Sequence, residues 1–188
     1  FGEYGFPESH AASFALLVYS SSWLKCHEPA AFCAALLDSQ PLGFYAPAQI
    51  VRDAMNHGVE VRPIEVTNSF WHCTLEPSSR DPRQPAVRLG LELVQGFNEA
   101  AAQRLVAARA QRPFADIADL AHRANLNRCE IDALARADAL APLTGHRRQA
   151  LWATLGLDTD APRSAPLTAS ATAREPHASL LAPTEGRD

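Results

Sequence analysis

The sequence predicts a mostly α-helical protein with a small β element. Apolar residues recur at helical spacing over residues 9–26, and helical patterns return between residues 98 and 155. Between these parts, VEVRPIEV (59–66) and VRLGLELV (87–94) alternate apolar and polar residues and are rich in β-branched side chains, which is typical of strands. The 188 residues, of which 47% are hydrophobic, suffice for a real core.

Three helices are expected in the first 58 residues. The first covers residues 9–26 with Ser9 as its N-cap. It is apolar on nearly all sides, which predicts that it is buried. The second starts at Pro29, a residue suited to a first helical turn, and runs to about Leu37. The third spans 47–56 and ends at Asn56-His57-Gly58, a C-cap signal.

The predicted strands at 59–66 and 87–94 flank a turn or exposed loop, SSRDPRQP (78–85), so we expect a hairpin or small sheet within 59–94. The helices that follow are expected at about 98–111, 115–123, 127–137 and 146–155. After Leu157 the chain is rich in Ala, Pro, Ser and Thr, which is typical of a flexible linker.

Cysteine usage favours reduced thiols in a cytoplasmic protein, because the four cysteines form no CxxC pair. A zinc site made by Cys26-His27 and His72-Cys73 is the less favoured alternative, since structural zinc ligands usually come in closely spaced pairs. We therefore expect no metal site. The longest apolar run, around Phe14–Val18, is too short to cross a membrane, which needs about 20 apolar residues.

Charge is unevenly distributed within the net value of −4. Residues 61–157 carry twelve arginines against ten acidic residues, so a nucleic-acid contact is expected in this block. Lys25 is the single lysine of the chain. Arginine suits bidentate contacts to phosphate, although a preference of the genome for arginine codons is the alternative explanation.

The segment LVQGFNEAAAQRLVAAR (93–109) has the pattern of a helix-hairpin-helix motif. A tight turn on Gly96 leads into a helix whose first N–H groups, aided by the helix dipole, can bind a phosphate. Asn98 tolerates left-handed geometry and caps helices well. The predicted phosphate-binding residues are Gln95, Gly96, Phe97 and Asn98. A plain strand-to-helix turn is the alternative.

A second unit of this kind is expected at 134–151, where Gly145, Arg147 and Arg148 precede a helix. Two arginines at a helix N-terminus oppose the helix dipole, which is easier to understand if they face an anion. Simple solvation of both side chains is the alternative.

The first 54 residues resemble the bacterial C-family DNA polymerases, the polymerase III alpha-subunit group. The family pattern F-x-x-Y-G-F-x-x-S-H-A-A-x-[YF]-A, then Y, then W/Y-L-K-x-H-x-P-x-x-F, is matched at Phe1, Tyr4, Gly5, Phe6, Ser9, His10, Ala11, Ala12, Phe14, Ala15, Tyr19, Trp23, Leu24, Lys25, His27, Pro29 and Phe32. PESHAASFA and LDSQPLGFYAPAQIVRDA (37–54) are most similar to the error-prone branch, and residues 93–155 resemble the tandem helix-hairpin-helix region of the same family.

The resemblance implies a domain organisation, and the absence of an initial Met fits a piece of a longer chain. It implies distal fingers helices at 1–58, a bridging β-rich segment at 59–94, a helix-hairpin-helix DNA-binding domain at 95–157 and a linker at 158–188. The function implied is error-prone, damage-induced DNA synthesis by the full-length protein. Its catalytic aspartates and Mg²⁺ are expected before Phe1, so this part alone is expected to be inactive and to bind no cofactor.

The partners implied are duplex DNA, the incoming deoxynucleotide, the rest of the polymerase chain, and possible contacts with a sliding clamp and damage-response proteins. Tyr4, Ser9 and His10 match family positions near the incoming nucleotide. Pro7-Glu8 stands where replicative relatives usually have Asn-Lys, and Asn98 where the first hairpin usually has glycine. The alternative is a non-catalytic helix-hairpin-helix module that binds DNA or serves as a scaffold.

Overall fold

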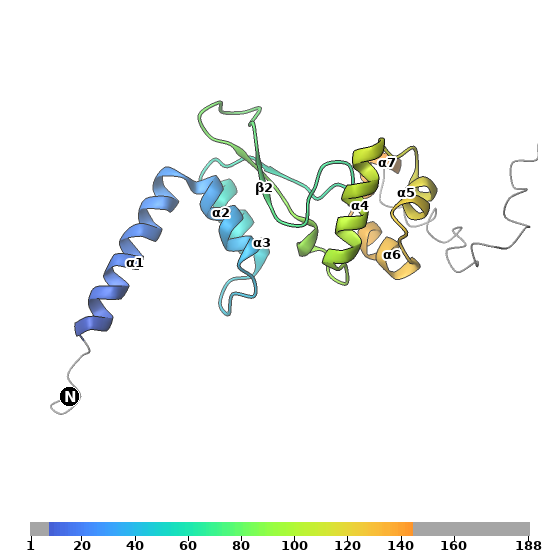
Figure 1. Ribbon diagram of the computed structural model, residues 1–188. Helices are drawn as coiled ribbons and strands as arrows, with labels where there is room; N and C mark the ends of the chain where they lie inside the picture. The colour runs from blue at the N-terminus through green and yellow to red at the C-terminus, as the bar shows by residue number, and fades with distance from the viewer. Residues whose placement is uncertain (1–7, 145–188) are drawn as a thin grey trace, which may run out of the picture.

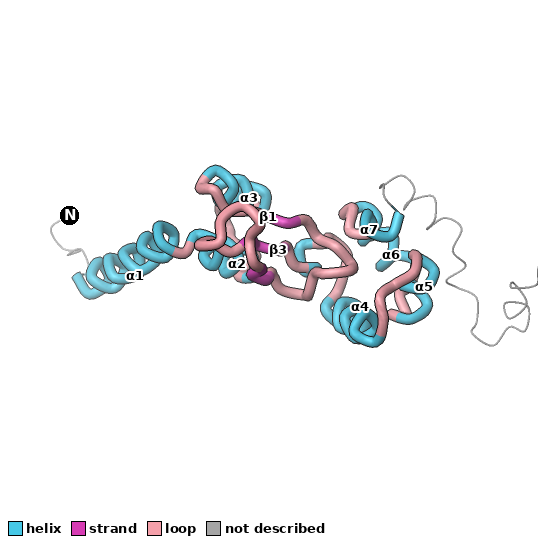
Figure 2. The backbone as a smooth tube through the Cα atoms, turned by 90° about the horizontal axis from the view of Figure 1, so that it is seen from above, coloured by secondary structure: helices cyan, strands magenta, loops and turns pink. Residues whose placement is uncertain are grey.

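The computed structural model describes residues 8–144, so Tyr4, Gly145, Arg147, Arg148 and the expected helix at 146–155 lie outside the described residues. The described part is mostly helical with one small sheet, and it is elongated (Figures 1 and 2). The predicted fold class is therefore confirmed.

The three expected N-terminal helices are present as α1 (Glu8–His27), α2 (Pro29–Asp38) and α3 (Pro47–Asn56). Pro29 and Pro47 start their helices because a first helical residue needs no N–H partner. After α3 the chain turns at Gly58, whose φ is +84°, and the N–H of Val59 donates to the carbonyl of Ala54 at 3.1 Å. This reverse turn requires the left-handed geometry that glycine adopts readily.

Two expectations about α1 are wrong. The helix already includes Glu8, so Ser9 lies inside the first turn and its carbonyl accepts a hydrogen bond from the Ser13 hydroxyl at 2.8 Å. The helix is also exposed rather than buried: Leu16, Val18 and Tyr19 are 62–69% exposed. In Figure 1 it projects away from the rest of the described chain, which it joins through α2 and the Lys25–Asp53 ion pair at 2.8 Å.

The small sheet has three strands in the order β1-β3-β2: β1 (Val61–Arg62), β2 (Thr74–Glu76) and β3 (Ala86–Arg88). Of the two forms expected within 59–94, the small sheet is present and the hairpin is not, because β1 pairs with β3 in parallel. Parallel strands need a long connection, and here the connection contributes the unforeseen strand β2, antiparallel to β3. The expected second strand is also too long, since the chain turns into the 3₁₀ helix η1 (Leu91–Leu93).

Gly90 explains why β3 gives way to η1. A Cβ atom at this position would lie 2.4 Å from the carbonyl oxygen of Trp71 and 2.8 Å from the backbone nitrogen of Cys73. The N–H groups of Leu91 and Glu92 then donate to the carbonyls of Phe70 and Trp71 at 2.8 and 3.1 Å. The backbone approach at Gly90 thus fixes where η1 lies.

The C-terminal helices are α4 (Glu99–Gln111), α5 (Ile117–Arg123), α6 (Arg128–Arg136) and the short, unexpected α7 (Ala141–Thr144). The first three are capped by Asn98, Asp116 and Asn127, whose side chains each accept an N–H of the first turn. Their bounds agree within two residues with those predicted from the sequence.

The described residues form two hydrophobic cores. One joins α2 and α3 to the sheet, with Leu37, Val59 and Val87 fully buried or nearly so. The other joins α4, α5 and α6 around Leu105, Leu120 and Leu134, and it also takes in Val66 and Leu91. Residues 59–94 therefore contribute to both cores, and they fix the sheet against the C-terminal helices.

Candidate nucleic-acid interface

The turn that precedes α4, where phosphate binding was predicted, is a tight and exposed glycine turn. Gly96 has φ of +84°, and Gln95 and Gly96 are exposed at its tip. Val94 and Phe97 point into the core, and the N–H of Phe97 donates to the carbonyl of Val94 at 3.1 Å. Phe97 therefore anchors the turn from below, while Gln95 and Gly96 present its backbone to solvent.

The start of α4 leaves N–H groups available for an anion. The first N–H groups of any α-helix lack intrahelical acceptors. Asn98 takes one of them, since its Oδ1 accepts the N–H of Ala101 at 2.9 Å. The N–H groups of Glu99 and Ala100 donate to no acceptor within residues 8–144. The negative charge of the Glu99 carboxylate repels an anion. This carboxylate accepts a hydrogen bond from the side chain of Gln103 at 3.1 Å.

A cation that sequence reasoning missed lies beside this turn. A surface hollow of about 670 Å³ is lined by Leu93 to Gly96, by Ala133 and Arg136 of α6, and by Ala137, which follows α6. Arg136 is exposed in the last turn of α6, and its guanidinium forms no hydrogen bond or ion pair with residues 8–144. The hollow therefore combines exposed backbone at a helix start with one free positive charge.

The turn after α6 is built without glycine. Asp138 has φ of +60°, and the N–H of Ala139 donates to the carbonyl of Leu134 at 3.0 Å, which closes the helix end. Val66 fixes this turn to the sheet segment, since its N–H donates to the carbonyl of Ala139 at 3.0 Å. Gly145, Arg147 and Arg148, which were predicted to bind phosphate beyond this turn, lie outside the described residues.

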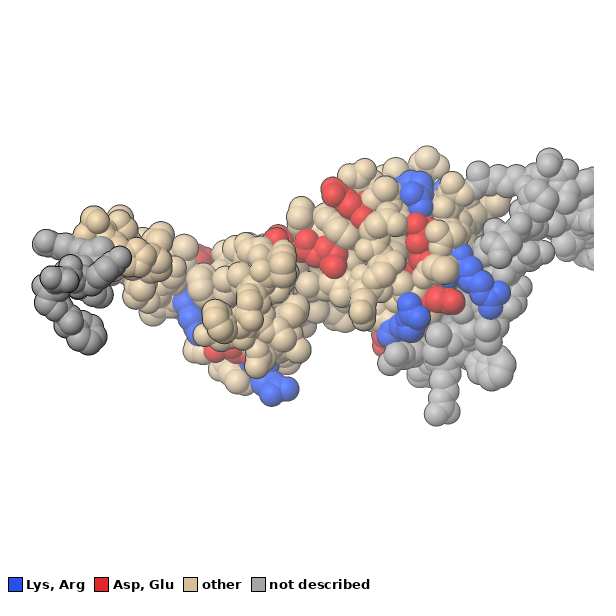
Figure 3. All heavy atoms as spheres, turned by 90° about the horizontal axis from the view of Figure 1, so that it is seen from below, with Lys and Arg blue, Asp and Glu red and all other residues tan. Residues whose placement is uncertain are grey.

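Most other arginines of this region hold the fold together. Arg109 donates to the carbonyls of Val66 and Ser69 at 3.0 and 2.9 Å, and burial lowers its pKa. Arg123 donates to backbone carbonyls at the end of α4 and to Asp119. The face in Figure 3 shows acidic and basic side chains interspersed over the helices instead of one basic patch. Most of these arginines therefore stabilise the fold and do not form a basic surface patch.

The predicted nucleotide-binding residues lie elsewhere in the molecule. Ser9 and His10 are exposed in the first turn of α1, at the opposite end of the structure from α4–α7 (Figures 1 and 2). The ring of His10 lies 4.3 Å from that of Phe14, one helical turn further on. The structure does not bring these two residues together with the turn at Gly96, so the two predicted sites are separate.

Comparison with known proteins identifies the family. Residues 58–150 match the family described as the helix-hairpin-helix motif. An error-prone DNA polymerase of Alkalilimnicola ehrlichii is 56% identical over 188 residues, which is 100% of this chain and 18% of that protein. One of Azoarcus sp. is 64% identical over 160 residues, 84% of this chain and 15% of the relative. The chain belongs to the error-prone DNA polymerase family.

This chain spans less than a fifth of the length of the curated error-prone DNA polymerases that it matches. The helix-hairpin-helix match of residues 58–150 contains the sheet, the turn at Gly96 and α4 to α7. The candidate interface described above therefore lies within the part of the chain that matches the helix-hairpin-helix motif. No helix within residues 8–144 is both long and apolar enough to span a membrane.

Proposed function

We propose that this chain serves a DNA-directed DNA polymerase as a grip on duplex DNA. The observation that carries the proposal is the exposed turn at Gln95-Gly96, which leads into α4 with two free N–H groups and has Arg136 beside it. Support comes from the helix-hairpin-helix match and from relatives named error-prone DNA polymerase at 56–64% identity.

The grip works through phosphates. A phosphate oxygen at the start of α4 accepts hydrogen bonds from the N–H groups of Glu99 and Ala100 and gains from the helix dipole. Arg136 supplies a positive charge from the neighbouring helix. Contacts of this kind fix the position of the duplex without reading its sequence, and they weaken as salt rises. Gly145, Arg147 and Arg148 extend the same grip in our proposal.

The other partners follow from the family. The polymerase acts in damage-induced translesion synthesis in the cytoplasm, with Mg²⁺ held by carboxylates outside this chain. Tyr4, Ser9 and His10 contact the incoming deoxynucleotide, and the exposed apolar sides of α1 pack against the rest of the polymerase. A sliding clamp and damage-response proteins are further partners in this proposal. A non-catalytic DNA-binding or scaffold module is the competing function, which the names of the relatives disfavour.

Duplex binding by the 188-residue chain tests the grip. Fluorescence anisotropy with two duplexes of unrelated sequence should give similar, weak affinities that fall with salt. Arg136→Ala should lower affinity for both duplexes equally and reduce the salt slope by about one. Arg83→Ala is the matched control, because Arg83 is also exposed and its side chain forms no hydrogen bond or ion pair within the described residues. Equal loss in both variants, or binding that ignores salt, would refute the proposed interface.

A further inference from the structure

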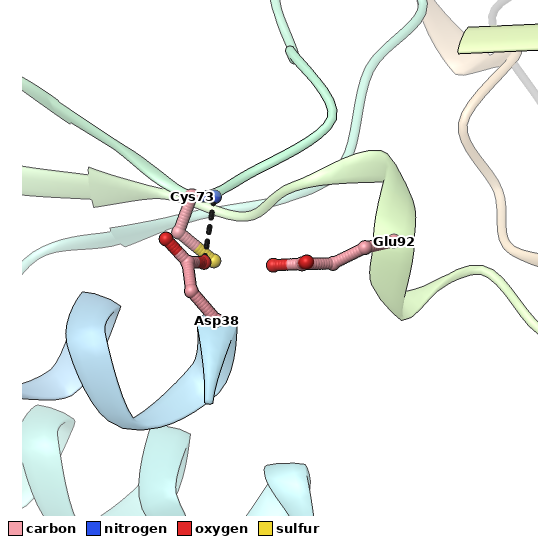
Figure 4. A group of neighbouring side chains, drawn as sticks. All are labelled: Asp38, Cys73 and Glu92. Carbon is pink, nitrogen blue, oxygen red and sulfur yellow. Dashed lines mark hydrogen bonds between the residues drawn. The ribbon is translucent and has the colours of Figure 1, made fainter. Parts of the chain in front are cut away.

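Three potential metal ligands converge from separate parts of the chain. Asp38 ends α2, Cys73 precedes β2 and Glu92 lies in η1. One ligand atom from each lies within 4.8 Å of the other two, and Figure 4 shows the three side chains directed toward a common point. The N–H of Cys73 donates to Asp38 Oδ1 at 2.9 Å, which holds the first two in place.

The charge of this cluster is not balanced by nearby cations. Neither carboxylate forms an ion pair with a lysine or arginine of residues 8–144; the neighbour of Glu92 is His72, whose Nδ1 lies 3.0 Å from Oε2. The other oxygen, Glu92 Oε1, is buried without a hydrogen-bond partner. A buried carboxylate oxygen without a partner is costly. A ligand that supplies positive charge at this point would remove the cost.

We propose that Asp38, Cys73 and Glu92 bind one Zn²⁺ ion. A thiolate together with two carboxylate oxygens suits zinc, because magnesium and calcium prefer all-oxygen sites. The hydrogen bond between the His72 ring and Glu92 Oε2 orients this carboxylate. Three protein ligands leave the fourth tetrahedral position to water. Binding converts the Cys73 thiol to a thiolate and releases its proton to solvent.

The zinc ion would connect the two cores of the protein. Asp38 follows Leu37 of the first core, and Glu92 follows Leu91 of the second. Because η1 runs directly into the turn at Gly96, a metal ion at Glu92 would stiffen the base of that turn. This inference does not rest on the polymerase function, since it concerns the stability of the fold.

Metal binding by the chelator-treated 188-residue chain tests the proposal. Isothermal titration with zinc chloride should give one ion per chain, and Co²⁺ should give a thiolate charge-transfer band. Asp38→Asn keeps an acceptor for the Cys73 N–H but removes the charge, so it should weaken zinc binding at least about tenfold. Cys73→Ser should abolish the cobalt band. The control is Cys26→Ser with Cys129→Ser, because both thiols are exposed and lie outside the cluster.

The outcomes separate a metal site from a cluster that binds no metal. Circular dichroism identifies any variant that fails to fold, in which case Asp38→Asn and Glu92→Gln decide the question by themselves. The proposal stands if the control variant binds one zinc ion and the Asp38→Asn variant binds weakly. It is overturned if the wild-type chain binds no stoichiometric zinc, if the cobalt complex lacks the thiolate band, or if both carboxylate variants bind zinc as tightly as the wild type.

Discussion

Replacing Gly90 by alanine should strongly destabilise the protein. The added Cβ would lie 2.4 Å from the oxygen of Trp71, 2.6 Å from the carbonyl carbon of His72 and 2.8 Å from the nitrogen of Cys73. All three are backbone atoms, so no side chain can rotate away. Overpacking of this kind costs about 1–3 kcal/mol. Displacing η1 would also strain the two hydrogen bonds donated by Leu91 and Glu92, each with a net contribution of about 1 kcal/mol.

The expected loss for Gly90→Ala is therefore about 3–5 kcal/mol in the free energy of unfolding. Urea denaturation followed by circular dichroism measures it. Gly43→Ala is the matched control, because a Cβ at Gly43 meets no atom within 4 Å, and it should change the free energy by no more than about 1 kcal/mol. If the free energy of unfolding of the Gly90→Ala variant lies within about 1 kcal/mol of the wild-type value, the close approach of Gly90 to the backbone of residues 71–73 does not constrain the fold.

Three further changes test local features. Asp138→Gly should stabilise the chain by about 1 kcal/mol in urea denaturation, because glycine adopts the φ of +60° without a Cβ clash; a loss of stability would contradict this. Asn98→Ala should cost about 1 kcal/mol, because Ala101 loses its cap, and an unchanged unfolding midpoint would refute the cap. Hydrogen bonds led by that from Ser78 lower the pKa of Glu60 from 4.5 to about 2, so its stabilisation is present above pH 4.5 and disappears toward pH 2. The stability gap between wild type and Glu60→Gln should therefore shrink over that range, and a constant gap would disprove the shift.

Local signals in the sequence predicted the helices well. Pro47 and Gly58 mark the two ends of α3, and Asn98 and Gly96 mark the start of α4 and its turn. The pairing of the strands was beyond local signals, because β1 and β3 are far apart in sequence and parallel. The alternating pattern of 87–94 predicted one long strand, yet the backbone contact at Gly90 turns the second half into η1.

In the candidate sites, too, local sequence signals predicted some features, whereas others depend on how distant segments pack. The turn at Gly96 could be predicted because glycine and asparagine act on their own neighbours in the chain. Arg136 could not, since its position beside Gly96 depends on how α6 packs against the turn. The exposure of α1 was mispredicted because an apolar helix indicates that a partner exists without indicating whether the partner lies in the same stretch of chain.

The three arginines that the proposal assigns to the DNA grip set a quantitative expectation for its salt dependence. Each arginine that neutralises a phosphate contributes about 0.9 to the slope of log affinity against log salt. Arg104, Arg109 and Arg123 donate to acceptors of the fold, so they have little capacity left for phosphates. If Arg136, Arg147 and Arg148 carry the grip, the slope should be about −3. Arg136→Ala should then reduce this salt slope by about one third. The double variant Arg147→Ala with Arg148→Ala should reduce it by about two thirds. A slope well beyond −3 in the wild type would show that cations outside this set bind the duplex.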